Sequence, residues 1–208
     1  STDVNITQET GFAHLNLSFS GFMNNLTGYW SFDGESSNDT SYDYSKWNRD
    51  GTYNRSSLNT TSCFYGQCAT FRGHNNNSVV ISNGTFVRNY PFSSSLWFKV
   101  NDSSNGGDGV ETMFSVYGIS TVRVTIGFTD GAPPGTKGEL YYNVRNGGGG
   151  EAEIFAGTDG QFMDDKWHHI VAVSVTNDQH YMYVDGANIQ NDTLNSVTAP
   201  ASANRMNI

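Results

Sequence analysis

The chain carries few positively charged residues. Eleven Lys and Arg stand against twenty Asp and Glu, which gives a formal net charge of −9 at pH 7. Because the basic residues are scattered, they form no stripe that could meet phosphate groups, so we expect no nucleic-acid partner. The apolar runs are also far shorter than the roughly 20 residues of a membrane-spanning helix, and we expect no membrane span in this segment.

Helical periodicity and the common catalytic signatures are missing as well. No window keeps apolar residues at positions i, i+3, i+4 and i+7, which argues against a helix-rich fold. The sequence has no Gly-x-Ser-x-Gly elbow, no phosphate-binding P-loop and no dinucleotide fingerprint. These absences argue against a serine hydrolase of that type and against a nucleotide-dependent enzyme.

Cysteine is scarce, with Cys63 and Cys68 as the only two, in the stretch SCFYGQCATF. One pair cannot complete a four-ligand zinc site, and the spacing is not that of a Cys-x-x-Cys redox motif. A tight turn through Gly66 would bring the two Cα atoms within bonding range. We predict a disulfide worth about 2 kcal/mol, since the closed loop is short. Free thiols are the alternative in a reducing compartment.

Asparagine is abundant, with 23 residues beside 42 Ser and Thr. This composition would give roughly five Asn-x-Ser/Thr acceptor triplets by chance, and the chain has twice that number. The excess predicts a heavily N-glycosylated protein that is secreted or displayed at the cell surface, with chance sequons in a loop-rich chain as the alternative. The acceptor residues are Asn5, Asn16, Asn25, Asn38, Asn54, Asn59, Asn76, Asn83, Asn101 and Asn191.

Strand signals recur along the whole chain. Short runs rich in Val, Ile and aromatic residues are bounded by Gly, Asn, Asp or Pro, which is typical of a β-sandwich. We therefore predict an all-β fold with two antiparallel sheets, and we expect the tryptophans within the strands to pack in its core. The expected strands cover residues 13–19, 28–32, 68–71, 78–82, 95–100, 111–118, 121–128, 139–144, 152–157, 168–175 and 180–186.

Four stretches carry a resemblance to a known family: GYWSFDGESSNDTSYDYSKWNRDGTYN (28–54), CFYGQCATFRGHNNNSVVIS (63–82), FSSSLWFKV (92–100) and DKWHHIVAVSVTNDQHYMYVDGANI (165–189). In this order they resemble the laminin-G-like, concanavalin-A-like jelly rolls of cell-surface proteins, including the pentraxin-like members. The resemblance implies a jelly roll over residues 28–208 with Trp97 pointing inward. Residues 1–27 are then a strand-like extension or the end of a preceding module.

The resemblance also implies further strands after the position of Ile208. The sandwich is therefore expected to be incomplete at its C-terminus. Either the chain is cut from something longer, or another segment completes the sheet by strand addition.

The segment 33–53 combines acids and rings. In similar jelly rolls calcium commonly lies at a sheet edge, and calcium takes hard oxygen ligands from several turns. The resemblance implies a structural calcium held by Asp33, Asp43, Asn48 and Asp50, with a solvated acidic loop as the alternative. The rings of the same loop suit the faces of sugars, because loops on a rigid scaffold often carry binding. They are Tyr42, Tyr44, Trp47 and Tyr53.

Two further pairs of residues bear on catalysis. His168 and His169 are adjacent on an expected strand, so they face opposite sides and are expected to be structural. Glu151 and Glu153 are two positions apart, as the carboxylates of a retaining glycosidase often are. The strand pattern of such enzymes is missing around them.

Three functions follow from these observations. The leading hypothesis is a non-catalytic extracellular module of a glycosylated adhesin, with glycans or surface proteins as partners. The second is a self-assembling structural subunit of a filament or surface layer, completed by strand addition. The third is a glycoside hydrolase that uses Glu151 and Glu153.

Overall fold

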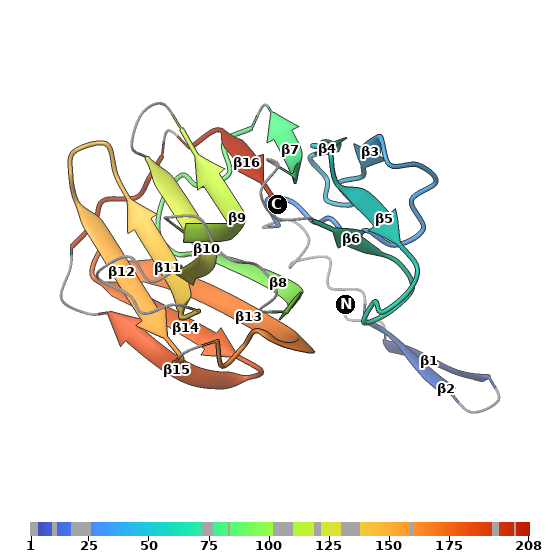
Figure 1. Cartoon of the computed structure of the whole chain (residues 1–208). Coiled ribbons are helices and arrows are strands. Elements are labelled where there is room, and N and C mark those ends of the chain that lie inside the picture. Colours follow the sequence, from blue (N-terminus) through green and yellow to red (C-terminus); the bar gives the residue numbers. More distant parts are fainter. Residues whose placement is uncertain are drawn as a thin grey trace.

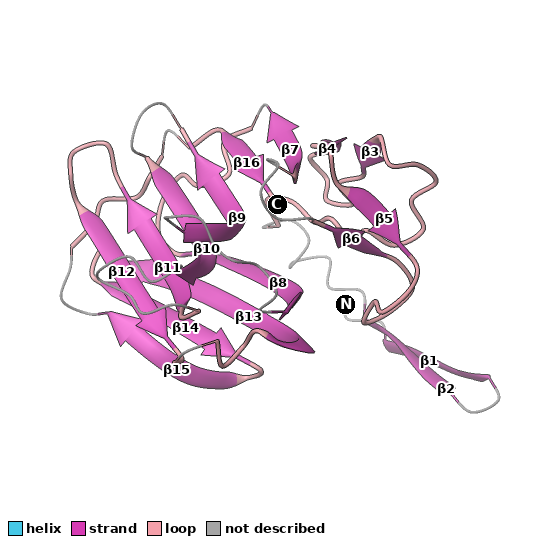
Figure 2. Cartoon of the chain, viewed as in Figure 1, coloured by secondary structure: helices cyan, strands magenta, loops and turns pink. Residues whose placement is uncertain are grey.

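The computed structural model describes residues 4–9, 12–17, 26–71, 77–82, 84–101, 110–118, 122–129, 138–158, 160–192, 196–201 and 203–208. These residues form strands and loops, and none of them is helical (Figure 2). Within the described ranges, no helix is long and apolar enough to cross a bilayer.

The larger sheet has eight strands, paired antiparallel throughout in the order β12-β11-β10-β9-β16-β7-β4-β3. In β12, for example, buried side chains alternate with half-buried ones, because one face of the strand meets the core. The bounds are β3 (Thr40–Ser41), β4 (Gly51–Asn54), β7 (Ser78–Ser82), β9 (Val110–Tyr117), β10 (Arg123–Thr129), β11 (Leu140–Arg145), β12 (Glu151–Ala156) and β16 (Arg205–Asn207).

The second sheet has four strands in the order β15-β14-β13-β8, and it forms the other layer of the sandwich (Figure 1). Its bounds are β8 (Phe92–Asn101), β13 (Asp164–Thr176), β14 (Gln179–Val184) and β15 (Ala187–Asp192). Phe98 of β8 meets Phe128 of β10 with ring centroids 5.6 Å apart. The Tyr142 hydroxyl of β11 lies 2.6 Å from Ser174 Oγ of β13. The predicted two-sheet antiparallel sandwich is confirmed.

Two short hairpins form sheets of their own. One consists of β1 (Val4–Glu9) and β2 (Phe12–Leu17), and the other of β5 (Ser57–Asn59) and β6 (Cys68–Thr70). A disulfide joins Cys63 to Cys68, whose Cα atoms are 5.5 Å apart, and it closes the tip of the β5–β6 hairpin. The predicted disulfide is confirmed. The division into residues 1–27 and 28–208 stays a prediction.

The segment 28–32 is not a strand, although its sequence predicts one. Phe32 has a positive φ of 60°, which no strand tolerates. The backbone amide of Tyr29 donates to the side chain of Asp43. The C-terminal strand β16, which the sequence pattern missed, lies inside the large sheet between β7 and β9. Three residues are too few to show a strand pattern, and pairing on both sides forms this strand.

Candidate functional site

The loop of residues 26–50 is organised around the buried carboxylate of Asp43. Its Oδ1 accepts hydrogen bonds from the backbone amides of Tyr29 at 2.9 Å and Ser45 at 2.8 Å. Its Oδ2 accepts from the Arg49 amide and from Ser45 Oγ, both at 2.8 Å. Burial raises the pKa of Asp43, but these donors lower it by more, so the net shift is downward. Asp43 therefore holds the loop as an anion.

A second buried carboxylate, Glu35, connects the same loop to the sheet. Its Oε1 accepts from Ser41 Oγ and from the Tyr42 amide, both at 3.0 Å. Its Oε2 accepts a short hydrogen bond from the hydroxyl of Tyr53. Burial, with the added effect of Glu35, raises the pKa of Tyr53 far above its ordinary value.

The structure places Tyr53, one of the predicted ligand-binding rings, apart from the other three. Tyr53 belongs to strand β4 and is 8% exposed, so its ring faces the core instead of a ligand. The strand GTYN alternates buried and exposed residues, and Tyr53 falls on the buried side.

The other predicted rings lie open to solvent. Tyr42, Tyr44 and Trp47 are between 42% and 49% exposed, and so is Tyr29, which sequence reasoning missed. The rings of Tyr29 and Tyr44 lie 6.3 Å apart. The Arg49 guanidinium lies 5.0 Å from the centre of the Trp47 ring. The loop therefore presents rings in fixed positions, as a stacking surface requires.

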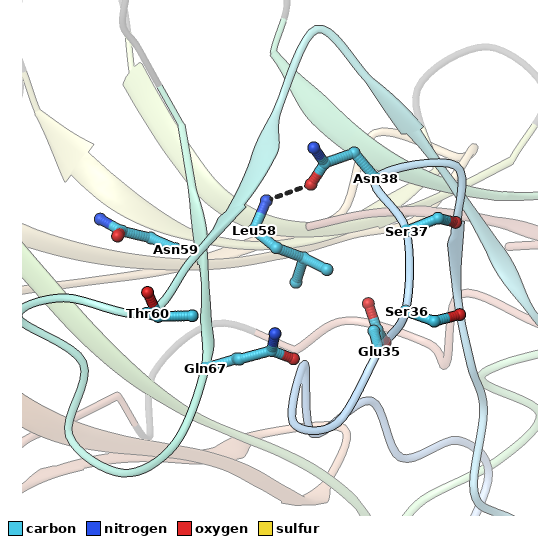
Figure 3. A pocket seen from close by; sticks show the side chains of 8 residues that line it. All are labelled: Glu35, Ser36, Ser37, Asn38, Leu58, Asn59, Thr60 and Gln67. Carbon is cyan, nitrogen blue, oxygen red and sulfur yellow. Dashed lines mark hydrogen bonds between the residues drawn. The ribbon is translucent and has the colours of Figure 1, made fainter.

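A pocket of about 280 Å³ opens between this loop and the β5–β6 hairpin (Figure 3). Asn38 Oδ1 accepts a hydrogen bond of 2.6 Å from the Leu58 amide across it. Asp33 Oδ1 accepts from the Gln67 amide at 2.7 Å, which ties the hairpin to the loop. Most of the lining is hydroxyl and amide. The lining residues are Glu35, Ser36, Ser37, Asn38, Leu58, Asn59, Thr60 and Gln67.

Gln67 holds the unusual atom of this pocket. Its side-chain Oε1 is buried and has no hydrogen-bond partner among the described residues. In Figure 3 the side chains of Gln67 and Glu35 face each other across the pocket. A buried acceptor without a donor costs about 1–3 kcal/mol, so a turn of the Gln67 side chain that brings this oxygen to a hydroxyl group in the pocket would recover that cost.

Three of the four residues predicted to hold calcium already accept hydrogen bonds through their carboxylate oxygens. Asp43 uses both carboxylate oxygens to accept from four donors. Asp50 Oδ1 accepts from the Asp43 amide, and Asp33 Oδ1 turns to Gln67 on the hairpin. Asn48 occupies a left-handed turn with φ 49°. Donor hydrogens thus point at both oxygens of Asp43 and at one oxygen each of Asp33 and Asp50, which disfavours a calcium ion there. Across the described ranges, no three His, Cys, Asp or Glu side chains gather in a metal-holding group.

The calcium prediction is tested by thermal unfolding. Because amide donors occupy the Asp43 oxygens, we expect the same Tm in calcium and in EDTA. A Tm several degrees higher in calcium, absent with magnesium, would establish a site that the present contacts do not favour.

The structure also corrects the expected orientation of Trp97. It was expected to point inward, but it is 48% exposed. The neighbouring Phe98 takes the inward position of β8, so Trp97 falls on the outer face. There it stacks on Phe64 of the disulfide loop, with ring centroids 4.2 Å apart, and on His169 of β13, at 4.8 Å. Trp167, also half-buried on this face, donates from Nε1 to the Ser62 carbonyl at 2.9 Å.

His168 and His169 face opposite sides of β13, as expected. His168 Nδ1 lies 2.8 Å from Asp185 Oδ2, and Nε2 lies 3.0 Å from Asp164 Oδ1. Burial lowers the pKa of His168, but Asp185 and Asp164 together raise it by more. His169 Nε2 lies 2.8 Å from Ser95 Oγ.

Glu151 and Glu153 share the outer face of β12, and polar neighbours engage both. Glu151 Oε1 accepts from Asn143 Nδ2 at 2.8 Å and pairs with Arg123 at 3.4 Å. Its Oε2 lies 3.8 Å from an Arg145 nitrogen. Glu153 accepts from the Tyr141 hydroxyl at 2.9 Å.

The predicted acceptor asparagines fall into three groups. Asn38, Asn54 and Asn191 are exposed, and Asn59 is half-buried beside the pocket. Asn5, Asn16 and Asn101 belong to strands β1, β2 and β8. The predicted acceptors Asn25, Asn76 and Asn83 lie outside the described residues. Glycosylation stays a prediction.

Comparison with known families decides the assignment. The Laminin_G_3 family model, described as the concanavalin A-like lectin/glucanases superfamily, matches residues 73–208, more than half of the chain. The chain belongs to this family. The resemblance read from the four motifs is confirmed. None of the candidate pocket falls within the match, because the pocket residues of this laminin-G-like domain, from Glu35 to Gln67, all precede residue 73.

Solved structures share the fold of this laminin-G-like domain at low identity. The binding domain of Paraclostridial Mosquitocidal Protein 1 matches with a TM-score of 0.64 and 13% identity, over 89% of this chain and 47% of that one. The botulinum neurotoxin serotype G binding domain matches with a TM-score of 0.64 and 13% identity, over 88% and 42%. A structure of botulinum neurotoxin type C matches with a TM-score of 0.61 and 15% identity, over 92% and 44%.

The chain thus spans less than half the length of these structures. Identities this low establish a common fold and nothing more. A search of curated proteins found no match.

Proposed function

We propose that this domain is a non-catalytic binding module of a glycosylated extracellular or cell-surface adhesin, and that its ligand is a glycan bound in the pocket. This proposal rests mainly on the side-chain oxygen of Gln67, which is buried and has no hydrogen-bond donor among the described residues. A ligand hydroxyl that donates to this oxygen removes its desolvation cost of about 1–3 kcal/mol. Surface proteins are the alternative partner.

The rest of the pocket suits the same ligand class. Hydroxyl and amide groups of Ser36, Ser37 and Thr60 line it, and a sugar offers several hydroxyls to such groups. Exposed rings of Tyr42, Tyr44 and Trp47 stand on the loop that forms one wall. Rings and hydroxyl partners on one rigid loop are what a sugar needs for stacking and hydrogen bonding.

The names of the similar structures agree with a binding role. Two are named binding domains, of a mosquitocidal protein and of botulinum neurotoxin G. The type C structure belongs to a toxin whose cell entry is described as dependent on interaction with two ganglioside molecules. These relatives support binding, and the pocket chemistry of this chain supports a glycan as its ligand.

Two arrangements support a non-catalytic role. Glu151, a predicted glycosidase carboxylate, pairs with Arg123 and Arg145, and its neighbour Glu153 accepts from a tyrosine. Elsewhere among the described residues, Ser174 and His180 lie 2.8 Å apart but are fully buried and closed to substrate. In the other Ser–His contact, that of Ser95 with His169, the His169 ring is stacked on Trp97. Hydrolysis of the bound glycan, lost in Glu151→Gln or Glu153→Gln, would contradict the proposal.

The extracellular setting rests on the disulfide and on exposed acceptor asparagines such as Asn54 and Asn191. Oxidising compartments favour both features. Intact mass before and after deglycosylation tests it in protein secreted from a eukaryotic host. We expect a mass loss of several glycans, and an unchanged mass would contradict glycosylation.

Gln67→Met is the variant that tests the pocket. Methionine keeps the side-chain length and removes the orphan oxygen, so we expect the free energy of unfolding to rise by about 1 kcal/mol. We also expect at least about tenfold weaker binding of the glycans that a glycan array selects, because the hydrogen bond to the ligand is lost. Isothermal titration and urea unfolding measure the two effects.

Gln190→Met, on exposed β15, is the matched control and should change neither quantity. Unchanged glycan affinity in the Gln67 variant would exclude the pocket as the site. Lower stability in that variant would show that the oxygen has a partner in solution.

We propose a structural subunit of a filament or surface layer as the second candidate. Strand β8 favours it, because this ten-residue strand lies at the edge of its sheet and no described strand pairs with its other side. Long open edges accept strands from other chains. Sedimentation velocity over a range of concentrations tests assembly, and a single monomer boundary throughout would contradict it.

A further inference from the structure

The tip of the β5–β6 hairpin exposes two aromatic rings side by side in the sequence. Phe64 is 61% exposed and Tyr65 is 75% exposed, the highest values among the large hydrophobic residues that the structure describes. Both lie inside the loop that the Cys63–Cys68 disulfide closes. Rings this open gain little from burial, so a packing role does not account for Tyr65.

The tip is held rigidly from two sides. Phe64 stacks nearly parallel on Trp97, at an interplanar angle of 19°, and Trp97 stacks in turn on His169. On the strand side, Trp167 Nε1 donates to the Ser62 carbonyl at the start of the loop. On the other side, the Gln67 amide donates to Asp33. A ring fixed before binding loses little conformational entropy when a ligand stacks on it.

We propose that Phe64 and Tyr65 form a second carbohydrate site, which takes the apolar face of a pyranose ring. This site is separate from the Gln67 pocket and shares with it only the ligand class. The stack of Phe64, Trp97 and His169 supports the platform from below, and the exposed ring of Phe64 is its upper surface. Sugars with a flat C–H face stack on such rings while their hydroxyls stay at the rim.

The size of the platform favours a sugar over a protein. A fully exposed aromatic side chain presents about 150–250 Å², so the two rings leave roughly 200–350 Å² open. A stable protein interface needs about 800 Å² on each partner. Polar groups for sugar hydroxyls stand nearby, since Lys99 lies on the same face of β8 as Trp97 and pairs with exposed Asp165 at 3.3 Å.

Affinity electrophoresis tests the platform with a soluble glucan, mannan and galactan as probes in the native gel. We expect at least one polysaccharide to retard the wild type. Phe64→Ala and Tyr65→Ala should each weaken the interaction at least about fivefold, since stacking and apolar contact are lost. Phe64→Trp should retain it. Phe71→Ala, at an exposed phenylalanine outside the stack, is the matched control.

Each outcome separates the two sites. Gln67→Met should leave the retardation by the ring platform in place, and loss in Gln67→Met alone would assign the sugar to the pocket. Unchanged retardation in the Phe64→Ala/Tyr65→Ala double variant, or no retardation of the wild type by any probe, would overturn the ring site.

Thermal unfolding by circular dichroism shows whether Phe64→Ala remains folded. If Phe64→Ala does not fold, the retardation of Tyr65→Ala and Phe64→Trp decides whether the ring site exists. Loss of self-association in the double variant, with no effect on sugar, would assign the rings to a second copy of the chain.

Discussion

Replacing Asp43 by alanine is expected to lower the free energy of unfolding by about 3–5 kcal/mol, since it leaves several buried donors without an acceptor. The carboxylate accepts from three backbone amides, those of Tyr29, Ser45 and Arg49, and from the Ser45 hydroxyl. A backbone amide in a loop has no other partner to turn to once the side chain is gone. The loop that forms one wall of the pocket should loosen, and glycan affinity should fall with it. Urea unfolding followed by tryptophan fluorescence measures the loss.

Asp43→Asn and Asp178→Ala complete this experiment. Asparagine keeps one acceptor oxygen, so the free energy of unfolding of Asp43→Asn should lie between those of the wild type and Asp43→Ala. Asp178 is exposed and accepts one hydrogen bond from Thr176, so its removal should cost little. Because the pKa of Asp43 is lowered in the folded state, its contribution is present above the ordinary carboxyl pKa. It is lost as pH falls through the folded value. A loss below about 1 kcal/mol in Asp43→Ala would refute the anchoring role.

Stability is also expected to fall as pH rises from about 6 to about 8.5, through the titration of His168. Both ring nitrogens of His168 face carboxylates, those of Asp185 and Asp164, and only the protonated ring donates to both. Burial lowers its pKa, and the two carboxylates outweigh that effect and raise it above the usual 6.5. A raised folded pKa means that the contribution is fully present below the unfolded value. It is lost as pH rises through the folded value.

His168→Gln isolates this effect. Glutamine cannot be charged, so the Tm of the variant should change little across the range in which the wild type loses a few degrees. Lys166 also pairs with Asp164, and it stays charged throughout this range. His169→Gln, on the outer face, should keep the wild-type slope. A wild-type Tm that is flat or rises between these pH values would contradict the charged state assigned to His168.

The sequence was most informative where strands are long and alternate. The run DKWHHIVAVSV shows a buried residue at every second position, and it became β13. Strands β3 and β16 are two and three residues long and show no pattern, because pairing with their neighbours creates them. Residues 28–32 have the aromatic character of a strand, yet the Asp43 carboxylate captures the Tyr29 amide. That contact spans 14 positions and is invisible to a local pattern.

The candidate site was only partly predictable. The exposed rings Tyr42, Tyr44 and Trp47 follow from a loop rich in aromatic residues. In SLWFKV either Trp97 or Phe98 has to point inward, and only the contact of Phe98 with Phe128 fixes which one does. Gln67 gave no signal, because its buried oxygen results from two distant segments that meet. The hairpin docks on the 33–38 segment through Asp33 and Asn38.

A crystal structure of the domain with a glycan chosen from the array tests the central claim most directly. The account predicts the sugar in the pocket between Ser36 and Thr60, with a hydroxyl about 2.7–3.0 Å from Gln67 Oε1. A sugar bound only elsewhere, with the Gln67 side chain turned to a protein donor, would contradict it.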